Sequence, residues 1–344
     1  MSIIKGKKML VTCAGILVVD LIAADLPKIS DPGELLFVSR GIEMHTGGHA
    51  GNVSIDLRKL SLEAGKVSVV CAVGDDLFGD FIENILREHG VTTHLQRIRG
   101  VGTSKTLALV VKGEDRRFHT DIGANWHLNS GHVWSVLKEE KPIVFYVGGV
   151  GIMGKFDEEL TGTLQEAKNL GCITFVDPVT PYKHGWDSVI SALKWTDIFH
   201  CNKDEATSIT GKEEPEEAIE ALINMGANFV IISLGEKGLF AKTKETLFKM
   251  PAFKVPVVDP TGAGDAFCAG VIHGLLRIIG CKECELSNLS KDDILSILLE
   301  GEASGAACVT MVGTTTAVTR DRVDQLLMEQ GSDILAQCQA INTS

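Results

Sequence analysis

Short apolar runs rich in β-branched residues alternate with stretches of helical length along most of this chain. A strand that is buried on both faces is apolar throughout, and alternation of strands with helices is typical of βαβ units. The sequence therefore predicts an α/β fold of three layers, in which helices cover both faces of a mostly parallel sheet. The expected strands are Val67–Val73, Ile143–Val147, Ile173–Val176, Ile198–His200 and Phe229–Ser233, and the expected helices include Phe78–Glu88, Glu158–Asn169 and Pro215–Met225.

Two segments, residues 21–46 and about 92–123, interrupt this alternation. Short runs such as Leu107–Val111 and Arg117–Thr120 carry turn residues and no helical period. They predict a small antiparallel sheet inserted into the α/β body, over the carboxyl ends of the strands, where ligands bind in such folds. No repeat or linker divides the chain, so we expect one domain over residues 1–330 and a helix or tail over 331–344.

Charge and cysteine content restrict the partners of the chain. Its 344 residues include 33 basic and 45 acidic ones, a net charge of -12, which argues against nucleic acid or an anionic membrane as partner. The 9 cysteines are scattered through apolar runs, as in reduced cytoplasmic proteins. The apolar run Met9–Val19 follows three lysines and resembles either a secretory signal or a first buried strand; Asp20 interrupts it and favours the strand.

A glycine-rich segment from Gly149 to Phe156 fits two phosphate-binding patterns. As G-x-G-x-x-G after a strand it suggests a dinucleotide site, with Asp177 as the acid that binds the ribose. An NAD-dependent oxidoreductase is therefore an alternative. As G-x-x-x-x-G-K it suggests a P-loop, but Phe156 stands where that motif needs Ser or Thr for magnesium.

The segment Asp259-Pro-Thr-Gly-Ala-Gly-Asp265 stands between a strand-like run and a long apolar helix. Gly262 and Gly264 permit a tight turn, so that the amides of Gly262, Ala263 and Gly264 point at one spot. With the positive end of the helix dipole they would bind a phosphoryl group. Asp265 is placed to accept a proton from an attacking hydroxyl, although a carboxylate there can also simply cap the helix. The segment therefore indicates phosphoryl transfer.

This segment resembles the D-T-x-G-A-G-D motif of the ribokinase, or PfkB carbohydrate kinase, family. In that family the last aspartate is the general base and the Gly-Ala-Gly amides form the anion hole. The resemblance implies a ribokinase-like fold and an ATP- and Mg²⁺-dependent kinase. It would transfer the γ-phosphate to a hydroxyl, expected to be a primary one, of a sugar or sugar-like metabolite. A nucleoside kinase or a sugar-phosphate kinase of the same family is the alternative.

An N-terminal motif of the same family is also present. Gly47 and Gly48 precede Asn52, and Asp20 follows the first predicted strand. The resemblance implies that these four residues bind the hydroxyls of the acceptor, and one carboxylate can accept hydrogen bonds from two vicinal hydroxyls. The chain departs from ribokinase at His49, where ribokinase has lysine, which leaves the acceptor open.

Two further motifs follow in the family's order. Asn202-Lys-Asp-Glu205 matches N-x-x-E, which implies that Glu205 holds Mg²⁺ through water and that Asn202 lies near the nucleotide phosphates. Gly235, Lys237 and Gly238 resemble the turn that lies along the nucleotide. We assign Thr261 to the nucleotide side of the site.

The remaining expectations concern monovalent cations and assembly. Similar enzymes bind K⁺ through backbone carbonyls near the position of Asp259 and in a loop that Val309–Gly313 matches, so a K⁺ site is a hypothesis here. The exposed edges of an inserted sheet invite pairing with a second copy, which suggests a homodimer through this lid.

Overall fold

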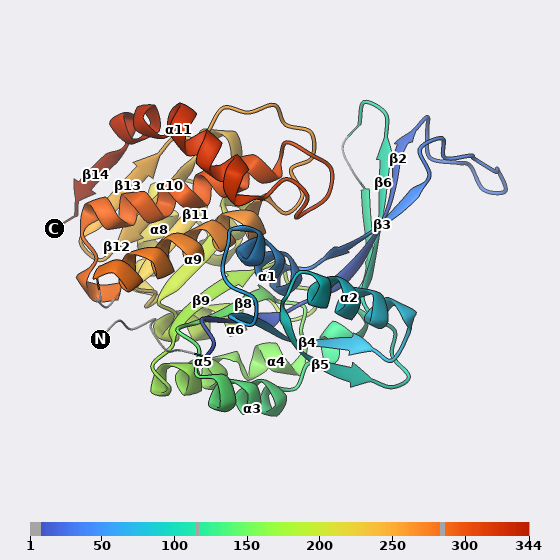
Figure 1. Cartoon of the computed structure of the whole chain (residues 1–344), viewed down its shortest axis with the longest axis horizontal. Coiled ribbons are helices and arrows are strands. Elements are labelled where there is room, and N and C mark those ends of the chain that lie inside the picture. The colour runs from blue at the N-terminus through green and yellow to red at the C-terminus, as the bar shows by residue number, and fades with distance from the viewer. Residues whose placement is uncertain (1–7, 115–116, 283–285, 344) are drawn as a thin grey trace.

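The protein folds into three layers around a large sheet, from which a smaller sheet projects (Figure 1). The computed structural model describes residues 8–114, 117–282 and 286–343. The large sheet has ten strands in the order β14-β13-β12-β11-β10-β9-β8-β1-β4-β5, and the smaller one has four in the order β3-β2-β6-β7.

Seven strands of the large sheet run parallel, and the apolar runs predicted all of them except β5. The central strands β1, β4 and β8 are buried along their whole length because helices cover both faces, whereas the edge strand β5 is only partly buried. They are β1 (Val11–Gly15), β4 (Val67–Gly74), β5 (Thr92–Ile98), β8 (Val144–Val150), β9 (Ile173–Pro178), β10 (Ile198–Asn202) and β11 (Phe229–Ser233).

Two layers of helices enclose this sheet, each with its own apolar core. One layer holds α1 (His49–Lys59), α2 (Leu77–Glu88), α9 (Ala263–Lys282), α10 (Lys291–Cys308) and α11 (Arg320–Gln337). The other holds α3 (Ser130–Glu140), α4 (Lys155–Glu158), α5 (Leu160–Asn169), α6 (Asp187–Ala192), α7 (Lys203–Thr210) and α8 (Pro215–Asn224). Short 3₁₀ turns lie at η1 (Gly123–His127), η2 (Leu193–Trp195), η3 (Gly235–Lys237) and η4 (Leu286–Asn288).

Helix α9 is apolar and long enough to cross a membrane, yet 72% of its apolar stretch is buried inside the protein. It packs against α10 and α1, which is the environment of a central core helix. Its apolar sequence therefore follows from its burial against these neighbouring helices.

Three antiparallel strands extend the large sheet at one edge: β12 (Leu239–Thr243), β13 (Thr246–Met250) and β14 (Gln339–Asn342). The predicted helix or tail over 331–344 is thus the end of α11 followed by strand β14. That strand was not predicted because its four residues are all exposed and carry no apolar pattern.

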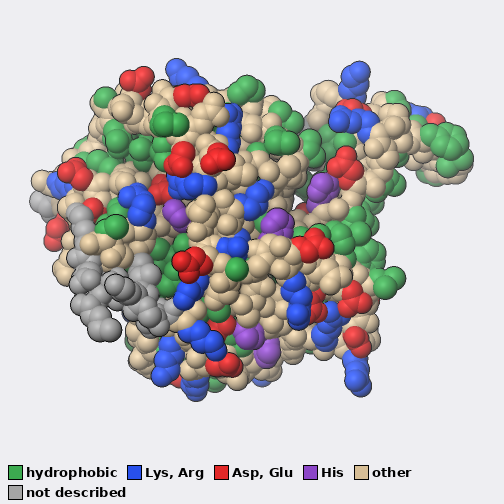
Figure 2. Space-filling model, viewed as in Figure 1, with side chains coloured by type: hydrophobic (Ala, Val, Ile, Leu, Met, Phe, Trp, Pro, Cys, Tyr) green, Lys and Arg blue, Asp and Glu red, His purple; other side chains and the backbone are tan. Residues whose placement is uncertain are grey.

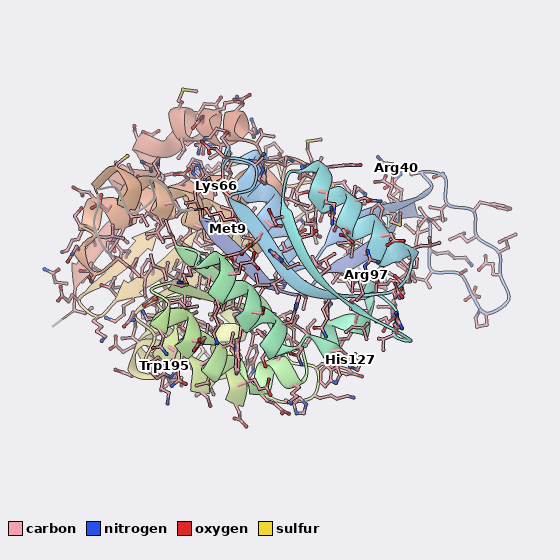
Figure 3. All side chains as sticks on the ribbon, turned by 60° about the horizontal axis from the view of Figure 1, so that its bottom comes forward. Met9, Arg40, Lys66, Arg97, His127 and Trp195 are labelled. Carbon is pink, nitrogen blue, oxygen red and sulfur yellow. The ribbon has the colours of Figure 1, made fainter. Side chains whose placement is uncertain are left out.

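The smaller sheet consists of β2 (Val18–Leu26), β3 (Ile42–Gly47), β6 (Lys105–Val111) and β7 (Arg117–Asp121). The prediction of a purely antiparallel sheet was wrong, because the central pair β2 and β6 runs parallel. Strand β2 follows β1 and strand β6 follows β5, and both β1 and β5 are parallel strands of the large sheet. For this reason β2 and β6 leave the carboxyl edge of the large sheet in the same direction. In Figure 3, the loop between β2 and β3 extends away from the body, with Arg40 close to its return.

Two predicted boundaries of the inserted sheet were wrong. The apolar run Met9–Val19 is divided between β1 and β2, so Asp20 lies in the smaller sheet and not at the end of the first strand. Thr92–Ile98 is β5, an edge strand of the large sheet paired with β4, so the second inserted segment begins after Ile98.

Candidate active site

The strands of the parallel sheet end at one edge, and the predicted site residues lie at or near it. Gly15 at the end of β1 pairs with Gly148 of β8, which in turn pairs with Asp177 of β9. Asn202 and Ser233 end β10 and β11 side by side. A hollow separates the smaller sheet from the body, and histidine and acidic side chains border it (Figure 2).

The turn before α9 depends on Gly262. Its φ is 81°, and a Cβ there would lie 2.8 Å from Cβ of Thr314. Helical hydrogen bonding begins with the amide of Ala266, which donates to the carbonyl of Gly262 over 2.9 Å. The amides of the first turn have no acceptor within the helix, and that of Ala263 donates to the carbonyl of Pro260 over 3.4 Å. A Cβ at Gly264 would meet only the His200 ring, at an ordinary 3.6 Å, so the turn itself does not require Gly264.

Asp259 links this turn by hydrogen bonds to the loop that follows α10. Its Oδ1 accepts from the amide and the hydroxyl of Thr261, over 3.0 and 2.6 Å, and its Oδ2 accepts from the amide of Gly313 over 3.3 Å. The carbonyl of Val309 accepts from the amides of Val258 and Asp259, over 2.7 and 3.2 Å. The structure thus brings together the two segments predicted to hold K⁺, and direct hydrogen bonds join them.

The N-terminal and C-terminal motifs meet at Asp265. Nδ2 of Asn52 donates to Oδ2 of Asp265 over 2.7 Å, across 213 residues of sequence. The hydroxyl of Thr314 donates to Oδ1 of Asn52 over 2.8 Å and thereby fixes the amide orientation. Asp265 is 8% exposed. Burial raises its pKa above the ordinary value, while His49 and the bond from Asn52 act in the opposite direction.

Asp20 lies against the glycine pair before α1. A Cβ on Gly47 would lie 2.2 Å from Oδ2 of Asp20, so the carboxylate can occupy this position only beside a glycine. Gly48 has φ 88°, and a Cβ there would lie 2.5 Å from the carbonyl oxygen of Ile16. Burial raises the pKa of Asp20 to about 6, with His45 opposing this effect. The structure thus brings Asp20, Gly47 and Gly48 together at the start of α1.

Asn202 and Glu205 cap the N-terminus of α7. Oδ1 of Asn202 accepts from the amide of Glu205, and Oε2 of Glu205 accepts from the amide of Asn202, both over 2.9 Å. The N-x-x-E pattern is therefore a capping box that holds both side chains at the edge of the sheet. Burial raises the pKa of Glu205, and nearby Asp177 adds to this.

The turn Gly235–Gly238 follows β11 at the same edge. The amide of Leu234 donates to the carbonyl of Gly238 over 2.8 Å. Gly238 has φ 87°, and a Cβ there would lie 2.0 Å from the carbonyl oxygen of Met250. Packing on β13 thus explains Gly238, while Gly235 and Lys237 are exposed.

The glycine-rich segment after β8 does not form a phosphate cradle. Asp157 is buried there, and its carboxylate accepts from the amides of Gly151 and Met153 over 3.2 and 2.8 Å. Asp177, the expected ribose acid, is buried and bonded to Tyr146. The dinucleotide interpretation was wrong, because protein groups already use the amides and the acid that it requires.

Residues 8–321 match the model of the pfkB family carbohydrate kinases. The chain belongs to the PfkB carbohydrate kinase family. Its enzyme class is therefore that of phosphotransferases acting on an alcohol group, and the oxidoreductase alternative is rejected.

Curated relatives of this PfkB kinase differ in their acceptors. The chain is 27% identical, over 79% of its length and 83% of the relative, to an ATP-dependent 6-phosphofructokinase of Thermoanaerobacterium thermosaccharolyticum. It is also 27% identical to the aminoimidazole riboside kinase of Salmonella typhimurium, covering 86% of this chain and 91% of that one. A ribokinase II from E. coli, solved with ATP and Mg²⁺, shares the fold with a TM-score of 0.75 and 21% identity over 93% of this chain and 99% of that chain.

Sequence reasoning missed a buried cluster beside Asp265. One ligand atom each of His49, Asp177 and Asp265 all lie within 4.8 Å of one another. Asp177 also contacts Nδ1 of His200 over 3.0 Å and accepts from the hydroxyl of Tyr146 over 2.9 Å. The available signal was that Asp177 and His200 are polar residues within apolar strands.

A cavity of about 740 Å³ lies at the opposite end of the parallel strands. Its lining includes Ile173, Ile198 and Phe229, which begin β9, β10 and β11, and none of the predicted site residues. In an open α/β fold, ligands bind at the carboxyl ends of the strands. The size of this cavity therefore does not make it the candidate active site of this PfkB kinase.

Proposed function

We propose that this PfkB kinase transfers the γ-phosphate of ATP to a hydroxyl, a primary one, of a sugar or sugar-like metabolite. The observation that carries this is the 2.7 Å hydrogen bond between Asn52 and Asp265. It joins the helix that follows the N-terminal glycine motif to a buried carboxylate in the first turn of α9, and this supports a shared site. Such an arrangement suits an acceptor hydroxyl, a base and a phosphoryl group in line.

In this mechanism Asp265 accepts the proton of the attacking hydroxyl as the bond to phosphorus forms. Its raised pKa suits a base that must take a proton near neutral pH. Asn52 keeps one carboxylate oxygen oriented. The amides of Gly262, Ala263 and Gly264, at the positive end of the α9 dipole, would stabilise the charge on the transferred group.

The nucleotide would lie along the ends of β10 and β11, beside Asn202, Gly235, Lys237, Gly238 and Thr261. The ATP and Mg²⁺ in the E. coli relative support this donor and this metal. Glu205 would hold Mg²⁺ through water, since Mg²⁺ retains several waters and needs few protein oxygens. Bound there, the metal would neutralise phosphate charge during transfer.

Asp20, Gly47, Gly48 and Asn52 would bind the acceptor. The smaller sheet would act as a lid that excludes water, which otherwise competes with the acceptor. The relatives include a kinase of a sugar phosphate and one of a nucleoside-like riboside, and both classes stay as alternatives.

Three further features belong to this proposal. The contact of Asp259 with the Val309–Gly313 loop is compatible with a K⁺ site at its backbone carbonyls. Exposed Ile42 on edge strand β3 and Phe118 on edge strand β7 favour a homodimer through the lid. Unpaired buried cysteines such as Cys13, Cys71 and Cys268 fit a cytoplasmic location.

A coupled assay of ADP release tests the proposed function. The acceptor panel comprises ribose, fructose, 2-keto-3-deoxygluconate, fructose 6-phosphate, inositol and nucleosides, each with MgATP. We expect acceptor-dependent ADP release with at least one of them, and its loss in Asp265→Asn. Equal release with and without every acceptor, or full activity of Asp265→Asn, would contradict the proposal.

A further inference from the structure

His49 is the first residue of α1 and lies at the carboxyl edge of the sheet. Its side chain packs against β8, where a Cβ on Gly148 would lie 2.5 Å from Cβ of His49 and 2.6 Å from the hydroxyl of Tyr146. Gly148 therefore makes room for this imidazole. His49 as a whole residue is only partly buried, whereas the two carboxylates of the cluster are buried.

Two carboxylates from different elements converge on this ring. Asp177 comes from β9 and Asp265 from α9, and one ligand atom of each lies within 4.8 Å of an imidazole nitrogen and of the other. Like charges at such a distance repel each other in a buried site. A cation between them removes that repulsion.

Asp177 is surrounded by groups that favour its ionised form. It contacts Nδ1 of His200 over 3.0 Å, and its Oδ2 accepts from Tyr146 over 2.9 Å and from the thiol of Cys268 over 3.5 Å. Burial alone would raise the pKa of Asp177, but His200, then His49 and the hydrogen bond from Tyr146, outweigh burial and lower it. Its charge therefore persists at neutral pH and acts on both Asp265 and His49.

We propose that His49 is a positioning residue whose protonated imidazole is held between Asp177 and Asp265 and keeps Asp265 ionised as the proton acceptor. The role of Asp265 rests on the proposed function, whereas the pairing itself does not. The charges of the neighbouring carboxylates also favour the protonated form of His49. Burial opposes a charge on His49, yet Asp265, Asp177 and Glu205 on α7 outweigh it and raise the pKa of His49.

The pairing is tested by following the imidazole signals in ¹³C–¹H NMR spectra of the full chain during a pH titration, with His49 assigned by its loss in His49→Gln. We expect Asp265→Asn to lower the His49 midpoint by about one pH unit or more. Glu140→Gln is the matched control, because Glu140 contacts His94 over 2.8 Å at the other end of the sheet. This control variant should change the titration midpoint of His94 and leave the midpoint of His49 unchanged. An unchanged His49 midpoint in Asp265→Asn overturns the inference.

A kinetic arm tests the consequence for the reaction, using MgATP and the most active acceptor of the panel. We expect the acidic limb of kcat/KM to move to higher pH by about one unit in His49→Gln, because Asp265 then holds its proton more tightly. His49→Lys keeps a cation and should retain the wild-type limb. A uniform loss of activity without a shift of the limb overturns the positioning role.

The two arms separate this inference from the proposed function. If the NMR coupling is present but Asp265→Asn is fully active, the pairing stands and the assigned base is wrong. If Asp265→Asn is inactive but His49 titrates unchanged, the proposed function stands and the inference falls.

Discussion

Buried carboxylates at opposite ends of the parallel sheet have opposite environments. At the amino end, Oε2 of Glu140 accepts from the hydroxyls of Thr12 and Ser68, both over 2.6 Å, and Oε1 contacts His94 over 2.8 Å. At the carboxyl end, Asp265 has a hydrogen bond from Asn52 and the charge of Asp177 close by.

The acid–base consequences differ accordingly. Burial would raise the pKa of Glu140, but its bonds with His94, Ser68 and Thr12 outweigh burial and lower it. Burial and Asp177 instead raise the pKa of Asp265. A buried acid with every oxygen bonded is held ionised and contributes to stability, whereas an acid with fewer bonds stays basic enough to accept a proton.

The largest expected effect separates these two acids by activity. Asp265→Asn should lower kcat by about 10³-fold or more, because the proton acceptor is lost, and should leave the melting temperature nearly unchanged. Glu140→Gln should retain kcat. Steady-state kinetics with melting curves check both. A comparable loss of kcat in the two variants would remove the distinction between the ends of the sheet.

Glu140→Ala sharpens the same comparison from the side of stability. It should lower the free energy of unfolding by about 2–4 kcal/mol, since two hydroxyls and His94 lose their partner. The pKa of Glu140 is lowered by folding, so its contribution is present above the ordinary pKa of glutamate and is lost as the pH falls below it. Denaturant unfolding at neutral and acidic pH measures this; a loss independent of pH contradicts it.

The two glycines of the α9 turn provide the next test. Gly264→Ala should fold normally, because the new methyl meets only the His200 ring at 3.6 Å, but should lower kcat by about 10²-fold by filling space next to the phosphoryl group. Gly262→Ala should lose stability as well, because φ of this residue is 81° and the added Cβ would lie 2.8 Å from Cβ of Thr314. Wild-type kcat in Gly264→Ala would disprove the assigned anion hole.

A smaller effect is expected at Asp20, whose pKa is raised to about 6. The ionised carboxylate is the better acceptor of hydroxyl bonds, so acceptor KM should rise as the pH falls below about 6. Asp20→Asn should raise KM about tenfold and make it independent of pH in this range. The role of Asp20 is tested by measuring the acceptor KM of both proteins across this pH range. An unchanged KM in the variant would exclude Asp20 from acceptor binding.

The smallest effect concerns Asp56 of α1. It is fully buried, and among the described residues neither of its carboxylate oxygens has a hydrogen-bond partner. Burial raises its pKa well above the ordinary value. Asp56→Ala should therefore increase stability by about 1 kcal/mol, with a gain that grows as the pH rises above about 4. A lower melting temperature at neutral pH would show that the carboxylate has a stabilising partner.

Sequence patterns predicted the parts of this protein in which local composition reflects burial. Apolar runs located the parallel strands except the partly buried edge strand β5, and the Asp259–Asp265 segment located the turn before α9. Sequence patterns could not show that β2 and β6 run parallel, because the direction of these strands depends on where the two segments leave the large sheet. Nor could they reveal β14, whose exposed residues carry no pattern.

The candidate site shows the same division. The family resemblance implied that Asp20 and Asn52 bind the acceptor and that Asp265 is the base, and the structure brings Asn52 to Asp265 directly. The part played by His49 and Asp177 depends on a three-dimensional convergence of α1, β9 and α9 that no spacing encodes. Sequence also suggested two indispensable glycines in the turn, whereas only Gly262 is required by its backbone angle.

The most direct test of the central claim is a single-turnover experiment with ATP labelled in its γ-phosphate and the most active acceptor of the panel. The wild-type protein should place the label on the acceptor within one turnover, and Asp265→Asn should bind ATP equally well but transfer the label about 10³-fold more slowly. Label found only on inorganic phosphate, or transfer by Asp265→Asn at the wild-type rate, would contradict the account.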